Sequence, residues 1–189
     1  MSLVELIAQA DERGLAASGL ACLDRCLPLL GADDEILRPL WAGLADDADA
    51  GAWGERLEQV RGRIDHAQAG PGEAVLLARR MLAATPSAPD AAEVRSWADA
   101  CSVAALRIHR LLEGAAPEEA DAASVGARRE GRTDGMSPLV AAELRRQVAV
   151  LELLSEHGAG GLRRALEVST EGRRVLRAVV SRRARGKRG

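Results

Sequence analysis

Apolar residues recur at the 3.6-residue spacing of an α-helix along nearly the whole 189-residue chain, and this periodicity limits the folds open to it. The chain has no Phe, no Tyr and only three Trp, and it is rich in Ala and Leu. Ala and Leu favour helices, whereas strands prefer aromatic and β-branched residues. The sequence therefore predicts an all-α fold, and its length fits one domain.

Helix boundaries are predicted from the capping residues, prolines and glycines that separate the apolar stripes. Asp33 and Asp34 are expected to cap one helix, Pro71 to open another, and Gly158 to end a third. The expected helices cover residues 3–12, 15–30, 36–44, 52–66, 71–82, 90–112, 117–125, 137–158 and 162–180, with a loop at 127–136. They predict a single-domain bundle of about seven to nine helices over residues 1–180, followed by a basic tail at 181–189.

The segment 90–112 has the clearest helical pattern in the chain. Asp90 followed by Glu93 resembles a capping box, with Asp in place of Ser or Thr. The stripe that follows comprises Val94, Trp97, Ala98, Cys101, Ala105, Ile108, Leu111 and Leu112. We expect this helix at the centre of the fold. Elsewhere, Pro28 is expected to stop or kink its helix, and Gly172 to weaken the last one.

Charge is distributed unevenly along the chain. Residues 1–125 carry 11 basic and 21 acidic side chains, whereas residues 126–189 carry 15 basic and 7 acidic ones. A chain polarised in this way can bind its own acidic half, a partner or a polyanion.

The sequence favours a cytoplasmic protein. No apolar run approaches the roughly 18 residues that cross a bilayer, and the N-terminal segment lacks the basic start of a signal peptide. Cys22, Cys26 and Cys101 are too few, and odd in number, for a disulfide scaffold.

Catalytic and cofactor motifs are missing from the sequence. GxSxG, HExxH, P-loop and GxGxxG patterns do not occur, so hydrolase and nucleotide-binding functions lose their usual support. Cys22 and Cys26 share a helix face and could hold a metal with Cys101 or a histidine. That face also carries leucines, and free cysteine packs there as a small apolar residue. We expect no catalytic residue, no metal and no cofactor.

Asp99 lies on the polar side of the 90–112 helix, four residues after Arg95, and His109 flanks the apolar stripe. One interpretation is an exposed ion pair of Arg95 with Asp99, worth a few tenths of a kcal/mol. The other is a polar surface facing a groove or a partner, which makes Arg95, Asp99 and His109 candidate binding residues. In that case a small apolar ligand could occupy a bundle pocket near Asp99.

Trp53 is a further candidate binding residue. It lies among Gly51, Ala52 and Gly54 and is expected to be partly exposed, as a tryptophan that anchors an interface is before binding. Trp41 and Trp97 are expected in the core.

The basic C-terminal region offers a nucleic-acid alternative. Its candidate phosphate-binding residues are Arg173, Arg174, Arg177, Arg182, Arg183, Arg185, Lys187 and Arg188. Because no aromatic residue accompanies them for base stacking and no DNA-binding motif is present, nucleic acid is the less favoured partner.

Three segments resemble one known family. Residues 21–30, ACLDRCLPLL, are similar to its early ERM-P-Y segment, with Arg25 and Pro28 in the matching places. Residues 35–44, EILRPLWAGL, are similar to its L-D-L-W-E-L stretch through Leu37 and Trp41, and residues 99–101 match its P-A-I-D-A-C helix. Over about residues 17–180 the chain resembles the domain of unknown function 416 family of small helical bacterial proteins. The resemblance implies an all-α fold and increases the interest of Asp99, but it implies no activity.

The sequence favours a non-enzymatic helical module that binds another protein, as an adaptor, a regulator or an immunity-type inhibitor. The first alternative is a small helical enzyme or ligand-binding protein with an apolar pocket near Asp99. The second is polyanion binding through the basic C-terminus.

Overall fold

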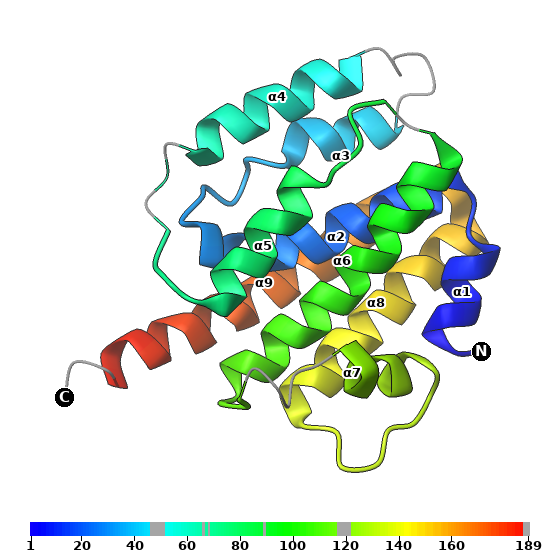
Figure 1. Cartoon of the computed structure of the whole chain (residues 1–189). Coiled ribbons are helices and arrows are strands. Elements are labelled where there is room, and N and C mark those ends of the chain that lie inside the picture. Colours follow the sequence, from blue (N-terminus) through cyan, green and yellow to red (C-terminus); the bar gives the residue numbers. More distant parts are fainter. Residues whose placement is uncertain (46–51, 66, 68, 89, 117–121, 187–189) are drawn as a thin grey trace.

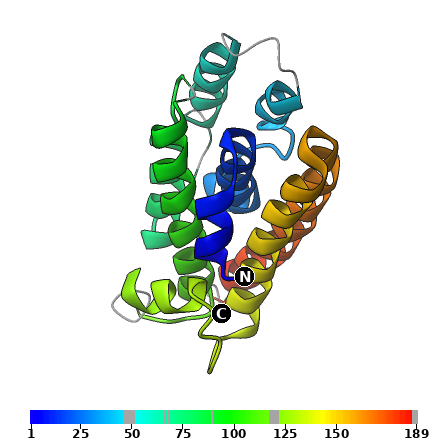
Figure 2. The same ribbon diagram turned by 90° about the vertical axis from the view of Figure 1, so that its right-hand side faces the viewer.

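Helix α2 (Glu12–Leu30) is the buried centre of the structure. Helices α5 (Glu73–Ala83) and α6 (Ala91–Leu112) cover one side of it, and α8 (Pro138–His157) and α9 (Leu162–Gly186) cover the other (Figures 1 and 2). Every residue of α2 from 14 to 27 is buried, as expected for a helix that neighbours surround. The centre is thus α2 and not α6, which buries one stripe and leaves its other face exposed.

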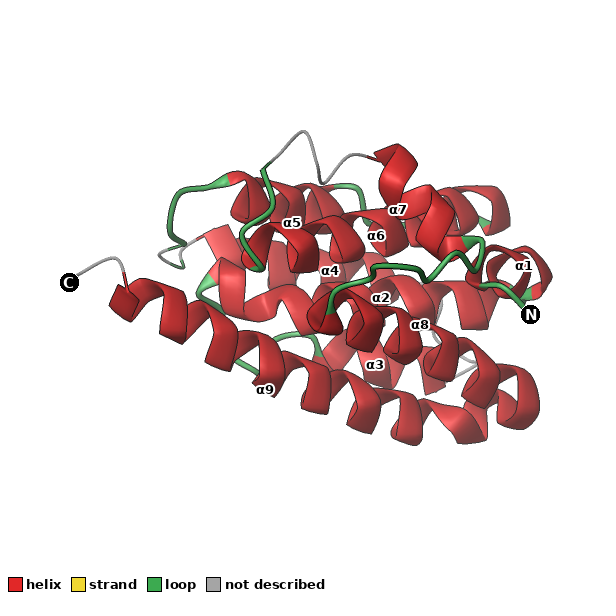
Figure 3. Cartoon of the chain, turned by 90° about the horizontal axis from the view of Figure 1, so that it is seen from below, coloured by secondary structure: helices red, strands yellow, loops and turns green. Residues whose placement is uncertain are grey.

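The computed structural model describes residues 1–45, 52–65, 67, 69–88, 90–116 and 122–186. The other helices are α1 (Leu3–Gln9), α3 (Arg38–Ala45), α4 (Ala52–Asp65), α7 (Ala122–Arg129) and the 3-10 turn η1 (Gly158–Gly161). These described residues contain no strand, which confirms the all-α bundle (Figure 3). Among them, no helix combines the length and the apolar character needed to cross a membrane.

Several predicted helix ends are confirmed. Asp90 caps α6 by accepting hydrogen bonds from the backbone N–H groups of Ala92 at 3.0 Å and Glu93 at 3.2 Å. Ser137 and Pro138 begin α8, and Gly158 ends it with a φ of 53°.

Other boundaries differ from the predictions near the N-terminus. The first helix ends at Gln9, because Asp11 caps α2 by accepting a hydrogen bond from Gly14 N at 2.7 Å. Pro28 does not stop α2, which continues to Leu30. Asp33 caps only a turn, through Glu35 N at 2.7 Å, and α3 begins after it.

Two differences concern the second half of the chain. Residues 127–129, predicted as loop, belong to α7, and its last residue is held by contacts of the Arg129 side chain with α6. Helix α9 continues to Gly186, so residues 181–186 of the basic tail are helical. Its last turns project beyond α5 and α6 (Figures 1 and 3).

Two glycines allow close contacts of neighbouring helices. A Cβ added at Gly19 of α2 would lie 2.5 Å from Cζ3 of Trp97 in α6. A Cβ at Gly172 of α9 would overlap Cδ of Arg25, which crosses the helix at that point. Gly172, predicted to weaken α9, is therefore the residue that lets α9 pack against α2.

The three tryptophans lie in the core and each indole N–H has an acceptor. Trp41 donates to Asp24 Oδ2 at 2.9 Å, Trp97 to the Met81 carbonyl at 2.9 Å, and Trp53 to the Pro86 carbonyl at 2.8 Å. Trp53 is only 8% exposed, so its predicted partial exposure was wrong. Small neighbours in the sequence do not prevent burial when α4 packs beside the segment before α6.

Candidate functional site

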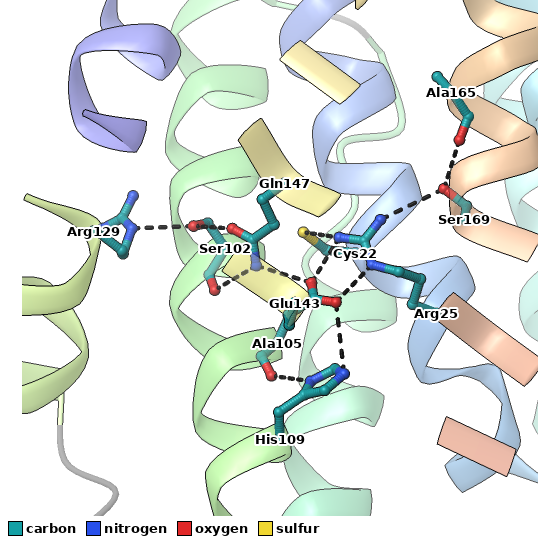
Figure 4. A network of polar contacts seen from close by, with 10 residues as sticks. All are labelled: Cys22, Arg25, Ser102, Ala105, His109, Arg129, Glu143, Gln147, Ala165 and Ser169. Carbon is teal, nitrogen blue, oxygen red and sulfur yellow. Dashed lines mark hydrogen bonds and ion pairs between the residues drawn. The ribbon is translucent and has the colours of Figure 1, made fainter. Parts of the chain in front are cut away.

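A buried ion pair of Arg25 and Glu143 lies at the centre of a polar network (Figure 4). Arg25 of α2 donates from Nε to Glu143 Oε2 at 2.8 Å and from Nη2 to Oε1 at 2.6 Å. Both side chains are 0% exposed. Burial is the largest influence and would raise the pKa of Glu143, but the charge of Arg25, the nearby His109 and the hydrogen bonds from Arg25 and Gln147 together hold that pKa below its ordinary value. The pair is therefore ionised and two-pronged, the strongest geometry for such a contact.

The remaining donors of Arg25 join α2 to α9. Its Nη1 lies 3.5 Å from Ser169 Oγ, and Nη2 lies 3.4 Å from Cys22 Sγ. Ser169 in turn donates to the Ala165 carbonyl at 3.0 Å. The Arg25 guanidinium thus contacts α8 and α9 as well as its own helix, α2.

Gln147 and Ser102 extend the network from Glu143 toward α6 (Figure 4). Gln147 Nε2 donates to Glu143 Oε1 at 2.9 Å and to the Ser102 carbonyl at 3.3 Å. Ser102 Oγ donates to Gln147 Oε1 at 2.6 Å. The amide and the hydroxyl, both buried, therefore satisfy each other across the α6–α8 contact.

His109 closes the other side of the network. Its Nδ1 lies 2.7 Å from the Ala105 carbonyl, which can only accept, so Nδ1 carries the proton. Nε2 lies 3.5 Å from Glu143 Oε2. Burial lowers the pKa of His109 in spite of the nearby Glu143, and the ring is neutral at physiological pH.

Arg129 connects the network to the surface. Its Nε donates to Ser102 Oγ at 3.0 Å, and its Nη2 pairs with Asp99, whose side chain is 51% exposed. Asp99 is therefore the outer end of a polar path that leads inward to Arg25.

A second set of ion pairs fixes α9 to the N-terminal half. The Arg173 guanidinium pairs with Asp24 and lies 3.5 Å from Asp34 Oδ1. Arg177 forms a two-pronged pair with Asp34, with Nη1 at 2.8 Å from Oδ2. Burial raises the pKa of Asp24, although Arg173 and Trp41 stabilise its charged form.

These buried groups are suited to holding helices together and not to chemistry on a substrate. Burial raises the pKa of Cys22 to about 12 and also raises that of Cys26 and Cys101, so these thiols are poor nucleophiles and poor ligands. Over the residues that the structure describes, no group of three His, Cys, Asp or Glu side chains is placed to hold a metal ion.

The predicted binding residues are not brought together at one open site. Arg95 does not pair with Asp99; it donates to the carbonyls of Ile7 at 2.7 Å and Ala8 at 3.1 Å, near the end of α1. The predicted Arg95–Asp99 ion pair was therefore wrong. His109 is buried beneath α8, whereas Arg95 is exposed and the Asp99 side chain is 51% exposed.

The basic residues of α9 divide into two groups. Arg173, Arg177 and Arg183 are bound within the fold, and Arg173 is buried, so it is not available to a phosphate. Residues 174, 182 and 185 are exposed. Lys187 and Arg188 lie outside the described residues.

The functional residues Glu143, Gln147, Ser102 and Arg129 were not predicted from the sequence. A signal was available, because Glu143 and Gln147 are polar and four residues apart beside the apolar stripe of the 137–158 helix. Polar residues at core positions of a helix indicate buried partners.

Two open grooves flank the last turns of α9. The α8–α9 groove, of about 510 Å³, is lined mainly by apolar groups of Leu112, Leu139, Ala142, Val175 and Val179. The α5–α9 groove, of about 460 Å³, lies between the start of α5 and the end of α9. Its lining includes Pro28, Leu29, Val75, Leu111 and Val180. Leu112 and Arg183 line both grooves, and Asp99 lines neither.

Comparisons of the chain with protein-family models, with curated proteins and with solved structures found no match. The resemblance to the domain of unknown function 416 family therefore stays a prediction, and the function has to be argued from the buried network and the grooves.

Proposed function

We propose that this protein is a non-enzymatic helical module that binds another protein, as an adaptor, a regulator or an inhibitor does. The observation that carries the proposal is the pair of apolar grooves on either side of the end of α9. Concave apolar surface that the chain leaves open is typical of sites where proteins bind.

The location of the titratable groups supports a binding function over a catalytic one. Arg25, Glu143 and His109, which have the residue types of an acid–base site, are all buried; Arg25 is hydrogen-bonded to Glu143, and His109 to the backbone carbonyl of Ala105. A general acid or base has to come within hydrogen-bond reach of the substrate. The exposed arginines of α9 and the open apolar grooves, in contrast, can be reached by a binding partner.

We also propose that the protein acts in the cytoplasm. The three cysteines are free and buried, and their positions within α2 and α6 suit packing in a reducing compartment.

A pull-down from the organism that encodes the chain tests the proposal. The tagged chain is incubated at about 0.15 M salt with a lysate treated with nuclease, which removes contacts made only through phosphates. We expect one protein to be retained at a near one-to-one ratio, and to be absent from a tag-only control. Retention of no protein above that control would overturn the proposal.

A further inference from the structure

Resting on the proposed function, we infer that the surface around residues 175–184 of α9 binds an amphipathic helix of the partner whose polar face is acidic. The two grooves would receive the apolar side chains of the partner helix. The arginines at the end of α9 would pair with its carboxylates.

Helix α9 contributes apolar side chains and an arginine to each groove. Val175, Val179 and Arg182 line the α8–α9 groove at the i, i+4 and i+7 spacing of one helix face. Val180 and Arg183 line the α5–α9 groove on the adjoining face. The side of α9 toward the α8–α9 groove is thus an apolar stripe that ends in Arg182, and the side toward the α5–α9 groove is one valine followed by Arg183 and Ala184.

Arg183 forms the ridge between the two grooves. Its Nη1 donates to the Leu111 carbonyl at 3.0 Å and to the Leu112 carbonyl at 2.5 Å, at the C-terminal end of α6. These bonds fix the side chain across Leu112, and its aliphatic part becomes part of both grooves. The surface is therefore preformed, which lowers the ordering cost of binding.

Charge complementarity identifies the occupant. Arg182 and Arg185 are exposed, and neither is paired with another described residue. Two acidic side chains line the grooves: Glu113 accepts from Leu139 N at 2.8 Å, and Glu73 lies 3.9 Å from Arg107. Arg182, Arg183 and Arg185 outnumber these two carboxylates, so the net charge beside the grooves is positive and favours a partner with carboxylates.

The dimensions suit a helix. The eight residues from Val175 to Arg182 span about 10 Å, or two helical turns. A partner helix of three to four turns would place its apolar side chains at i, i+3 or i+4, and i+7 along this length. Nucleic acid would leave the apolar lining unused, and a membrane favours a convex apolar face over two concave grooves.

Site-specific crosslinking tests the inference. The photoreactive residue p-benzoylphenylalanine replaces Val179, or for comparison Val4 of α1, a 39% exposed valine far along the sequence from the grooves. The pull-down described above is repeated with each chain under illumination. We expect a crosslink to the retained protein from position 179 only, within a segment that has helical apolar periodicity and an excess of Asp and Glu.

Charge variants supply the matched comparison. Val179→Glu is expected to reduce retention of the partner at least about tenfold, because it buries a carboxylate in an apolar contact, whereas Val4→Glu leaves retention unchanged. Arg182→Glu with Arg185→Glu is expected to weaken retention, and the same two positions changed to Lys to restore most of it. Thermal unfolding of each variant establishes that the fold is intact.

The outcomes separate the two proposals. If the unmodified chain retains no protein, the proposed function fails and this inference with it. If a partner is retained equally by Val179→Glu, or its crosslinked segment is not acidic, only the inference is overturned. Binding of Arg182 and Arg185 to RNA or to anionic lipid vesicles, with no effect of Val179→Glu, would also overturn it.

Discussion

Removing the negative charge of the buried ion pair should be among the most damaging single changes to this fold. In Glu143→Gln, Arg25 keeps its charge and stays buried, while its ionised partner is lost. Breaking a buried pair from one side costs about 3–5 kcal/mol, because the remaining charge lies unpaired in a medium of low polarity. A domain has about 5–15 kcal/mol of stability, so the expected loss is about a fifth of the total or more.

The free energy of unfolding can be measured by urea titration, with the fluorescence of the three buried tryptophans and far-ultraviolet circular dichroism as independent signals. Glu152→Gln is the matched control: the same substitution in the same helix, but at an exposed position, where a change of at most about 0.5 kcal/mol is expected. Unfolding slopes that agree between the variants would place the difference in stability and not in compactness.

A double variant identifies the source of the loss. In Arg25→Met with Glu143→Leu no charge of the pair remains, and apolar replacement of a buried pair is often nearly neutral. We expect the double variant to be more stable than Glu143→Gln alone. A cost below about 1 kcal/mol for Glu143→Gln, or a double variant less stable than the single one, would refute the reasoning.

Three further results are expected from urea unfolding. Gly172→Ala should lower the free energy of unfolding by about 1–3 kcal/mol through overpacking, despite the better helix propensity of Ala. Gly62→Ala, whose Cβ would meet nothing within 4 Å, should raise it by up to about 1 kcal/mol. Equal effects at both glycines would contradict the close contact at Gly172. Because burial lowers the pKa of His109, the unfolded chain takes up its proton first as pH falls below about 6.5, so stability is lost on acidification at up to about 1.4 kcal/mol per pH unit. His109→Gln should flatten that loss below about pH 6.5, and an unchanged pH profile would show that the ring is not buried as a neutral group. Trp41→Phe should cost about 1–3 kcal/mol by leaving Asp24 Oδ2 without its indole donor, and a cost near zero would indicate that water replaces it.

The sequence predicts the helices well because their signals are local. The cap at Asp90 and the stripe that includes Val94 and Trp97 lie within one segment, and α6 follows them closely. The end of α7 is different: residues 127–129 resemble a charged loop, but the Arg129 side chain bonds to Ser102 in another helix. Such a contact overrides local preference and leaves no trace in the periodicity.

The partners within the polar network are harder to predict from the sequence than the helix ends. Arg25 and Glu143 are 118 residues apart, and neither sequence neighbourhood identifies the other as its partner. Helical periodicity states which face is buried, but it does not state which buried polar groups meet. The error at Trp53 has the same origin, since its acceptor is the carbonyl of Pro86, 33 residues away.

The position of α2 has a consequence for how the chain is made. Helix α2 is synthesised early, yet about half of the contacts that cover it come from α8 and α9, at the other end of the sequence. Its Asp24 pairs with Arg173, which is synthesised 149 residues later. At about 5–20 residues per second, a ribosome needs about 7–30 s to supply that partner. During this interval the helix that is most completely buried in the finished fold lacks part of its cover, so the nascent chain is at its most vulnerable to aggregation and proteolysis before α9 emerges. A ribosome stalled short of α9 would thus leave a substrate for chaperones and not a smaller folded domain.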